Sequence, residues 1–207
     1  TSDKRVINFY NMARLLAVSD NSRRKRDFRT SFIKNLNLMI ASVKDFIETK
    51  ERLNLKLGNV KIENGDSRDV KLSNNSVDGI ITSPPYSIAL DYVQNDAHSL
   101  KDLGFDVSRM RKDFIGVRGT GRSRVELYNA DIEKSYSEMY RVLKPNKYAV
   151  IVIGNATYQG KEVKTAEFTI KYMESLGFKL IKNINKIIFG LYNVMKKENI
   201  LIFKKEK

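Results

Sequence analysis

The sequence predicts an α/β fold with a mostly parallel sheet, and two apolar runs carry this prediction. Residues 148–154, YAVIVIG, form a continuous apolar run of strand length, which is typical of a strand buried on both faces beneath helices. Residues 77–82, VDGIIT, predict a second core strand. Between them, residues 129–143 carry apolar side chains every three or four positions, which predicts a helix. Strands that alternate with helices favour a parallel sheet.

The N-terminal part predicts helices before the sheet begins. Apolar residues recur at helical spacing over 30–52, and an earlier helical stretch at 6–18 leads into a polar, basic connector. A short apolar alternation then predicts a strand at 59–63. We therefore expect a helical segment at 1–54 and an α/β part at 55–207.

The rest of the chain predicts one helix, two strands and one irregular stretch. Residues 165–176 predict a helix that ends at Gly177. Two late strands, at 178–189 and 198–204, have a short connector, as expected for an antiparallel pair. Residues 105–128, here called the basic segment, have no clean period and contain three glycines, which predicts a mobile loop.

The composition restricts the classes of function. The 207 residues carry a net charge of +14, from 38 Lys and Arg against 24 Asp and Glu, and this excess attracts polyanions such as nucleic acid. A lysine-rich surface without a specific partner is the alternative. With no cysteine and one histidine, a thiolate zinc site and a histidine-rich centre are excluded, and we expect no metal. No apolar run approaches the roughly 20 residues of a membrane helix, and the N-terminus lacks the core of a signal peptide, so we expect a cytoplasmic protein without membrane contact.

The strand at 77–82 ends at Ser83-Pro84-Pro85-Tyr86, here called the Ser-Pro-Pro-Tyr motif. A proline pair is a rigid stop for a strand, because proline lacks the N–H that the ladder requires, and this role alone explains many prolines. The chemical alternative follows from the location, since open α/β sheets bind ligands beyond the carboxyl ends of their strands. There the Ser83 hydroxyl and the Pro84 carbonyl offer hydrogen-bond acceptors, and Tyr86 offers a flat face. Together they suit a planar ring that bears an exocyclic amine.

The stretch Thr82-Ser83-Pro84-Pro85-Tyr86 resembles the catalytic motif of the amino-group DNA methyltransferases, which use S-adenosyl-L-methionine. "GDSRD" before it, and "IGVRGTG" and "RVLKPNKYAVIVIGN" after it, match the family in the same order, so that the similarity covers roughly residues 55–205. The resemblance implies a Rossmann-like methyltransferase sheet. It also implies a catalytic role for Ser83, Pro84, Pro85 and Tyr86, and cofactor contacts from Asp66, Ser67, Thr82 and Ser83. For Asp66, an ordinary turn after Gly65 is the alternative.

The resemblance further implies a reaction. The exocyclic nitrogen of a base is a poor nucleophile, because its lone pair is delocalised into the ring. Acceptors for both its hydrogens, from Ser83 and the Pro84 carbonyl, would free this lone pair, with the methyl group held in line. The base must leave the duplex, and Tyr86 would hold it by its face. The motif is more typical of cytosine-N4 methylation in a restriction–modification setting, with adenine-N6 or RNA methylation as the alternative.

One part of the family pattern is missing. These enzymes bind the cofactor with a glycine-rich turn, Phe-x-Gly-x-Gly, after the first strand, whereas the glycine-rich stretch at 116–124 follows no apolar strand. In the sheet order that the family implies, 3-2-1-4-5-7-6, the strand at 59–63 is number three and the strand at 77–82 is number four. The sheet is therefore expected to be incomplete, with its first two strands missing and two edges open. The chain is then a fragment, a protein that has lost cofactor binding or, as we prefer, half of a split enzyme whose second chain carries the glycine-rich motif.

The basic segment predicts contact with DNA. Its basic residues are Arg109, Arg111, Lys112, Arg118, Arg122 and Arg124. A solvated loop is the alternative, but a location beside the Ser-Pro-Pro-Tyr motif favours phosphate contacts next to a flipped base. A subunit that binds nucleic acid without catalysing a reaction remains the alternative from another class of protein.

Overall fold

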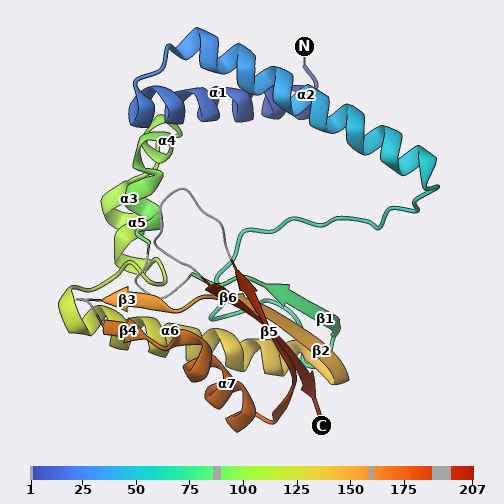
Figure 1. Cartoon of the computed structure of the whole chain (residues 1–207), viewed down its shortest axis with the longest axis vertical. Coiled ribbons are helices and arrows are strands. Elements are labelled where there is room, and N and C mark those ends of the chain that lie inside the picture. The colour runs from blue at the N-terminus through green and yellow to red at the C-terminus, as the bar shows by residue number, and fades with distance from the viewer. Residues whose placement is uncertain (1, 86–89, 159–160, 188–196) are drawn as a thin grey trace. The chain divides into compact units, whose positions relative to one another are not determined.

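The computed structural model describes residues 2–85, 90–158, 161–187 and 197–207 (Figure 1). The chain divides into two compact units. The first comprises Thr1–Glu63 with Gln94–Val107, and the second comprises Asn64–Val93 with Ser108–Lys207. All the site residues that the sequence predicts fall within the bounds of the second unit.

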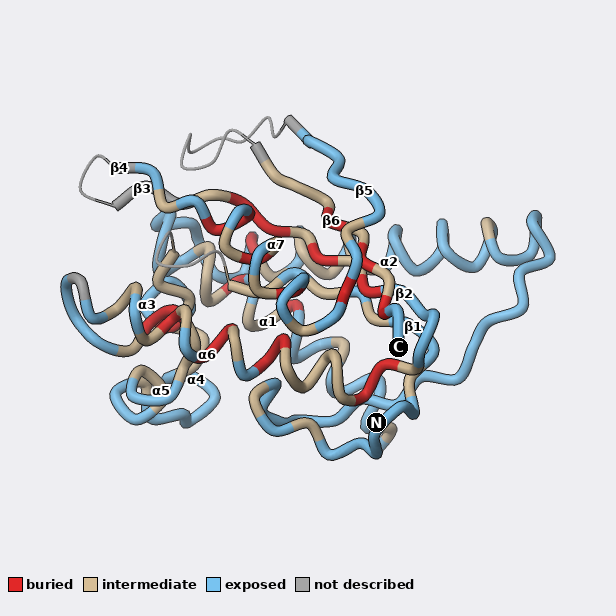
Figure 2. The backbone as a smooth tube through the Cα atoms, turned by 90° about the horizontal axis from the view of Figure 1, so that it is seen from below, coloured by how far each residue is buried: buried red, intermediate tan, exposed pale blue. Residues whose placement is uncertain are grey.

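The first unit contains two long helices, α1 (Lys4–Arg24) and α2 (Phe28–Arg52), and these confirm the two predicted helices with wider bounds. Asp3 and Asp27 fix where they begin, because each carboxylate accepts a hydrogen bond of 2.8 Å from a backbone N–H of the first turn. The short helix α4 (Ala97–Asp102) is tied to α1 by an ion pair of 2.6 Å between Arg14 and Asp102. Most of α2 is exposed (Figure 2). Among the described residues, no helix is long and apolar enough to cross a membrane.

The second unit is built on a four-stranded sheet with the strand order β1-β2-β6-β5. The strands are β1 (Val77–Thr82), β2 (Leu143–Ile153), β5 (Phe178–Ile187) and β6 (Lys197–Lys205). β1 and β2 are parallel, whereas β6 is antiparallel to both β2 and β5. The antiparallel late pair is therefore confirmed. The expectation of a mostly parallel sheet is wrong for the described strands, since they contain a single parallel pair.

Two helices, α6 (Gly121–Val142) and α7 (Thr165–Ser175), cover one face of this sheet and form the core with it (Figure 1). Tyr128 and Ile132 of α6 and Met173 of α7 are at most 1% exposed, as are Ile151 and Phe203 of the sheet. The burial of these apolar side chains provides the main stabilisation of the unit. Figure 2 shows the buried residues concentrated on α6 and the sheet.

The structure confirms the prediction that the helix α7 ends at Gly177. Gly177 has φ of 100°, a left-handed conformation that favours glycine after a helix. A Cβ atom there would lie 3.0 Å from the Tyr140 hydroxyl oxygen. Close packing and backbone conformation therefore both favour glycine.

The opposite face of the sheet is open along part of its width. Ile81 of β1 pairs in register with Val150 of β2, which pairs with Ile202 of β6, so that these three side chains lie on one face. Ile81 is 85% exposed, and Tyr148 on the same face is 48% exposed. The prediction that residues 148–154 are buried on both faces is therefore wrong, since only alternate residues of β2 are fully buried.

Two other predicted elements differ from the structure. The strand at 59–63 is not formed, because the segment has no ladder partner among the described residues, and Val60 and Ile62 are 84% and 89% exposed. The basic segment is not one continuous loop. It contains the helix α5 (Val107–Asp113) and the first turns of α6. The structure also contains a short helix α3 (Tyr92–Asn95). A hairpin of β3 (Ala156–Tyr158) and β4 (Lys161–Val163) had no counterpart in the prediction.

The two faces of the sheet should respond differently to mutation in the isolated chain. Ile151→Ala is expected to lower the free energy of unfolding by about 2–5 kcal/mol, because the side chain is fully buried. Ile81→Ala should cost less than about 1 kcal/mol, since the side chain is 85% exposed. Urea unfolding of both variants measures the difference, and equal losses would contradict the assignment of a covered and an open face.

Candidate functional site

The described part of the Ser-Pro-Pro-Tyr motif lies directly after β1, at the carboxyl end of the strand. Pro84 and Pro85 are half-buried, and Ser83 is exposed. The carbonyl oxygen of Pro85 accepts a hydrogen bond of 2.8 Å from the hydroxyl of Tyr128, whose side chain is 1% exposed on α6. A core tyrosine therefore fixes the backbone of the motif, and sequence reasoning missed this residue. Tyr86 lies outside the described residues.

The residues that follow the motif hold the basic segment. The carboxylate of Asp91 accepts a hydrogen bond of 2.6 Å from Arg111 at the end of α5. The next residue, Tyr92, lies with its ring centroid 6.4 Å from that of Phe114. An ion pair and a ring contact thus link the stretch after the motif to residues 111–114.

Asp66 forms a local turn with Arg68. Its carboxylate accepts the backbone N–H of Arg68 at 2.8 Å and the Arg68 guanidinium at 2.7 Å. The hydrogen bonds from this guanidinium lower the pKa of Asp66 below its usual value, because they favour the charged carboxylate. The Oγ atoms of Ser67 and Ser135 lie 3.0 Å apart. The turn that was the structural alternative for Asp66 is therefore formed, and it does not by itself exclude a ligand contact.

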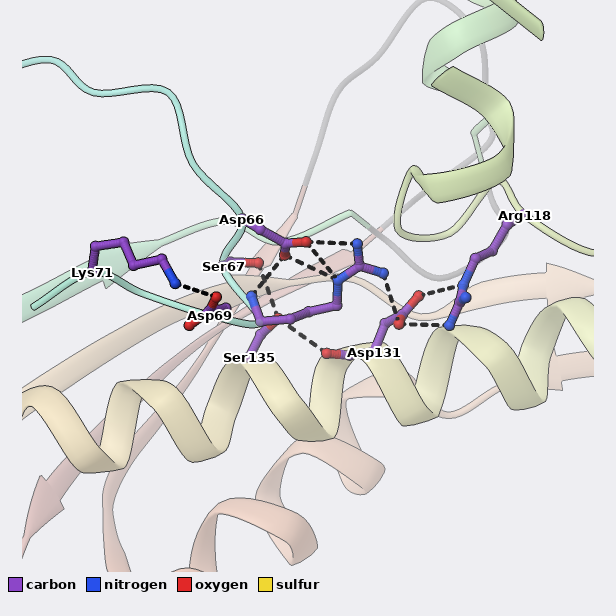
Figure 3. Close-up of polar contacts among 8 residues, drawn as sticks. Asp66, Ser67, Asp69, Lys71, Arg118, Asp131 and Ser135 are labelled. Carbon is purple, nitrogen blue, oxygen red and sulfur yellow. Dashed lines mark hydrogen bonds and ion pairs between the residues drawn. The ribbon is translucent and has the colours of Figure 1, made fainter. Parts of the chain in front are cut away.

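Arg68 contacts both Asp66 and the buried carboxylate of Asp131. Figure 3 shows Asp131 on its helix, with Asp66 on one side and Arg118 on the other. The Nη1 atom of Arg68 lies 3.0 Å from Oδ1 of Asp131 on α6, whose side chain is 1% exposed. Arg118 approaches the same carboxylate from the basic segment, with Nε 2.8 Å from Oδ2 and Nη2 2.7 Å from Oδ1. Acidic and basic groups thus alternate along Asp66, Arg68, Asp131 and Arg118. This pairing compensates the cost of burying a charged carboxylate.

A second polar contact binds residues 66–72, here called the Asp66 segment, to α6. The backbone N–H of Val70 donates to Glu138 at 2.8 Å, and Arg141 donates to the carbonyl oxygens of Val70 and Leu72 at 2.8 and 2.7 Å. Glu138 also accepts a hydrogen bond of 2.7 Å from Arg141. The hydrogen bond from Arg141 and, to a smaller extent, that from the Val70 N–H lower the pKa of Glu138 from 4.5 to about 2.

One stripe of α6 makes most of these contacts. It consists of Tyr128, Asp131, Ser135 and Glu138, here called the polar stripe. These residues follow one another at intervals of three or four, which places them on the same side of a helix. The polar stripe therefore holds the Ser-Pro-Pro-Tyr motif, the Asp66 segment and Arg118 against one rigid element.

The structure describes the side chains of five of the six predicted DNA-contact residues. Arg111 and Arg118 are bound to carboxylates, and Arg124 donates two hydrogen bonds to the carbonyl oxygen of Gly116, at 3.0 and 2.8 Å. Arg109 and Lys112 are exposed, and the side chain of Arg122 lies outside the described atoms.

An open hollow of about 440 Å³ in the basic segment brings some of these cations together. Its lining residues are Arg111, Lys112, Val117, Arg118, Gly119, Thr120 and Leu127. Gly119 has φ of 84°, and a Cβ atom there would lie 2.7 Å from Leu127. The glycines of 116–124 thus shape the turn between α5 and α6, and no strand precedes them, in agreement with their exclusion as a cofactor loop.

The fold and the proline-terminated strand define the class of protein first. β1 and β2 form a parallel pair, α6 and α7 cover the sheet, and β1 ends at Ser83-Pro84-Pro85, which agrees with the Rossmann-like α/β methyltransferase fold that the resemblance implies. The sequence profile of the family described as DNA methylase, of the N6/N4 type, matches residues 77–207. The chain belongs to this DNA methylase family. No curated protein matches the chain.

The chain is also similar to solved structures. A Thermus thermophilus protein whose name describes a DNA modification methylase, solved with S-adenosyl-L-methionine, shares 21% identity over 69% of this chain and 54% of that chain, with a TM-score of 0.46. The cytosine-N4-specific PvuII DNA methyltransferase shares 16% identity over 68% of this chain and 47% of that chain, with a TM-score of 0.46. An S-adenosyl-L-methionine-dependent methyltransferase from Methanosarcina mazei shares 12% identity over 70% of this chain and 66% of that chain, with a TM-score of 0.41. The chain spans about half the length of the first two.

S-adenosyl-L-methionine, the cofactor expected from the sequence, is the cofactor of this family. The described residues fit one edge of such a site, because Asp66 offers a carboxylate and Thr82 and Ser83 lie at the end of β1. They do not fit a complete site. The polar groups of Asp66 and Ser67 already contact Arg68 and Ser135, and no described strand leads through a glycine-rich turn into a helix.

The Glu138 contact should make stability depend on pH in acid. A carboxylate whose pKa is lowered in the folded state stabilises it above the unfolded pKa, and this stabilisation is lost as the pH falls through the folded pKa. The difference in unfolding free energy between wild type and Glu138→Gln should therefore be largest above pH 4.5 and shrink towards pH 2. Urea unfolding across this range measures it.

The matched control is Glu167→Gln, at an exposed carboxylate of α7 that pairs with Lys164. Its effect should be smaller at every pH, since exposed ion pairs contribute about 0–1 kcal/mol. A difference for Glu138→Gln that stays constant from pH 6 to pH 2 would contradict the assigned pKa.

Proposed function

We propose that this chain is the base-binding catalytic part of a DNA methyltransferase that acts on the exocyclic amine of a flipped base, with cytosine N4 preferred. The hydrogen bond from Tyr128 to the Pro85 carbonyl is the observation that carries this proposal. It ties the Ser-Pro-Pro-Tyr motif to the core and so holds Ser83 and the Pro84 carbonyl in a fixed place. Serine at the first position favours cytosine N4 over adenine N6, following the resemblance of the motif.

The chemistry of this chain is to hold and orient the amine. The Ser83 hydroxyl and the Pro84 carbonyl accept hydrogen bonds from the two N–H groups of the amine, which favours a tetrahedral nitrogen with a free lone pair. The two prolines restrict the backbone, so little entropy is lost when the base binds. When bound, S-adenosyl-L-methionine supplies an activated methyl group. One amine proton is then released towards water, and Tyr86 holds the base by stacking on its face.

The basic segment binds the DNA backbone in this proposal. The net charge of +14 supplies a general attraction for phosphates. The six basic residues of the segment contact phosphates, and Arg111, Arg118 and Arg124 also hold the segment in shape through their contacts within the chain.

A second chain carries the glycine-rich cofactor motif in the same proposal. The two outer strands of the sheet support this, because they differ in character. β5 presents Lys179, Lys182 and Lys186, and lysines protect an edge strand from pairing with another chain. β1 contains no lysine, pairs only with β2 among the described strands, and carries the exposed side chain of Ile81. A partner that adds parallel strands beside β1 would cover this edge.

Replacement of Ser83 tests the chemical role. Ser83→Ala should lower methyl transfer about 100-fold or more, because one acceptor for the amine hydrogens is lost. Tyr86→Ala should do the same, and both should keep most DNA binding. The assay is transfer of a tritiated methyl group to DNA, by the chain alone and with its partner. Ser175→Ala, an exposed serine of α7, is the matched control. Unchanged transfer in both site variants would contradict the mechanism.

The partner is tested by cofactor binding. Calorimetry should detect no tight binding of S-adenosyl-L-methionine to the purified chain alone, since the described residues supply one edge of a cofactor site. Addition of the partner should restore binding and methyl transfer. A folded monomer that binds the cofactor tightly by itself would rule out the need for a second chain. DNA binding without methyl transfer, both by the chain alone and with the partner, would favour the alternative of a subunit that binds nucleic acid without catalysing a reaction.

A further inference from the structure

Asp131 joins two parts of the site that the proposed chemistry treats as separate. One of its partners, Arg68, belongs to the Asp66 segment on the cofactor side. The other, Arg118, belongs to the basic segment on the DNA side. Neither partner has a role in holding the amine, and Asp131 itself is 1% exposed. The arrangement therefore calls for a function other than contact with a substrate.

The hydrogen bonds connect the two sides through shared groups. Oδ1 of Asp131 accepts from both Arg68 and Arg118, at 3.0 and 2.7 Å. Arg68 is itself shared, because its Nε and Nη2 atoms contact Asp66, at 2.7 Å for the shortest bond, while Nη1 contacts Asp131. A change at either end thus alters the donors that are left for the group beside it.

We propose that Asp131 is a positioning residue that couples DNA contact at the basic segment to the state of the Asp66 carboxylate. This inference rests on the proposed function. A phosphate that draws Arg118 away leaves Asp131 with Arg68 as its remaining partner. Arg68 then moves its contacts towards Asp131, and the Asp66 carboxylate becomes available to a cofactor donor. Because coupling between two binding sites is reciprocal, DNA and cofactor each strengthen the binding of the other, about 5-fold or more.

The first experiment needs neither DNA nor cofactor. Hydrogen exchange of the backbone amides at 66–70 reports the Asp66 turn, since the Arg68 N–H donates to Asp66. Arg118→Gln should speed this exchange about 5-fold in the full chain. The same substitution should have no further effect in an Asp131→Asn background, because the link is already broken. If Asp131 has a structural role without coupling, the effects of Arg118→Gln and Asp131→Asn on exchange at 66–70 should be additive.

Matched variants keep the test decisive. Arg124→Gln removes an arginine from the same segment, and Arg124 contacts the Gly116 carbonyl rather than Asp131, so it should leave exchange at 66–70 unchanged. If Asp131→Asn does not fold, Arg68→Gln serves as the background, since it breaks the link at the other side and leaves the pair of Asp131 with Arg118 intact. Additive effects, or an equal response to Arg124→Gln, would overturn the coupling.

The second experiment adds duplex DNA as the probe. In wild type, DNA should change exchange both at 116–124 and at 66–70, and in Asp131→Asn only at 116–124. A change at 66–70 in both proteins would overturn the role of Asp131. Failure of wild type to bind DNA would contradict the proposed function and the coupling to DNA, even where the first experiment still shows the link within the chain.

Discussion

The packing of α6 between the sheet and the polar loops is the constraint on which the rest of the site depends. One stripe of this helix, with Ile132 and Tyr136, is buried in the core. The neighbouring polar stripe holds the Ser-Pro-Pro-Tyr motif, the Asp66 segment and Arg118 through Tyr128, Asp131 and Glu138. Because core packing fixes the rotation of α6, it also fixes these three contacts relative to β1. Loss of the helix packing would therefore displace the motif and both segments together.

The sequence predicted the elements whose signals are local. The prolines after Thr82 marked the end of β1, and Gly177 marked the end of α7, since backbone chemistry alone sets both. The prediction of a strand at 59–63 was wrong. A strand needs a hydrogen-bonded neighbour, and apolar alternation alone does not show whether a neighbouring strand is formed among the described residues. The start of α6 was placed too late, because Gly119 and Gly121 suggested a loop although they only shape its first turn.

The site was predicted only in part, and the reason is again physical. The motif was found because its residue types are unusual at the end of a strand. Tyr128 and Asp131 were missed because their partners lie far away in the sequence, so that no local pattern reveals the contacts. The interval of three or four residues along the polar stripe was the available signal, but polar residues at this spacing usually face water. Only the folded chain shows that this stripe faces other parts of the site.

The open edge of β1 and the positions of Ser83 and the Pro84 carbonyl both support a division of the reaction between two chains. In the proposed function, this chain holds the base, and a second chain completes the cofactor site. The central claim is therefore that this chain selects the amine to be methylated. Nucleoside analysis of DNA methylated by the chain with its partner tests it most directly. The account predicts N4-methylcytosine as the product. Methylation at a ring carbon, such as C5 of cytosine, would contradict a site built to hold an exocyclic amine.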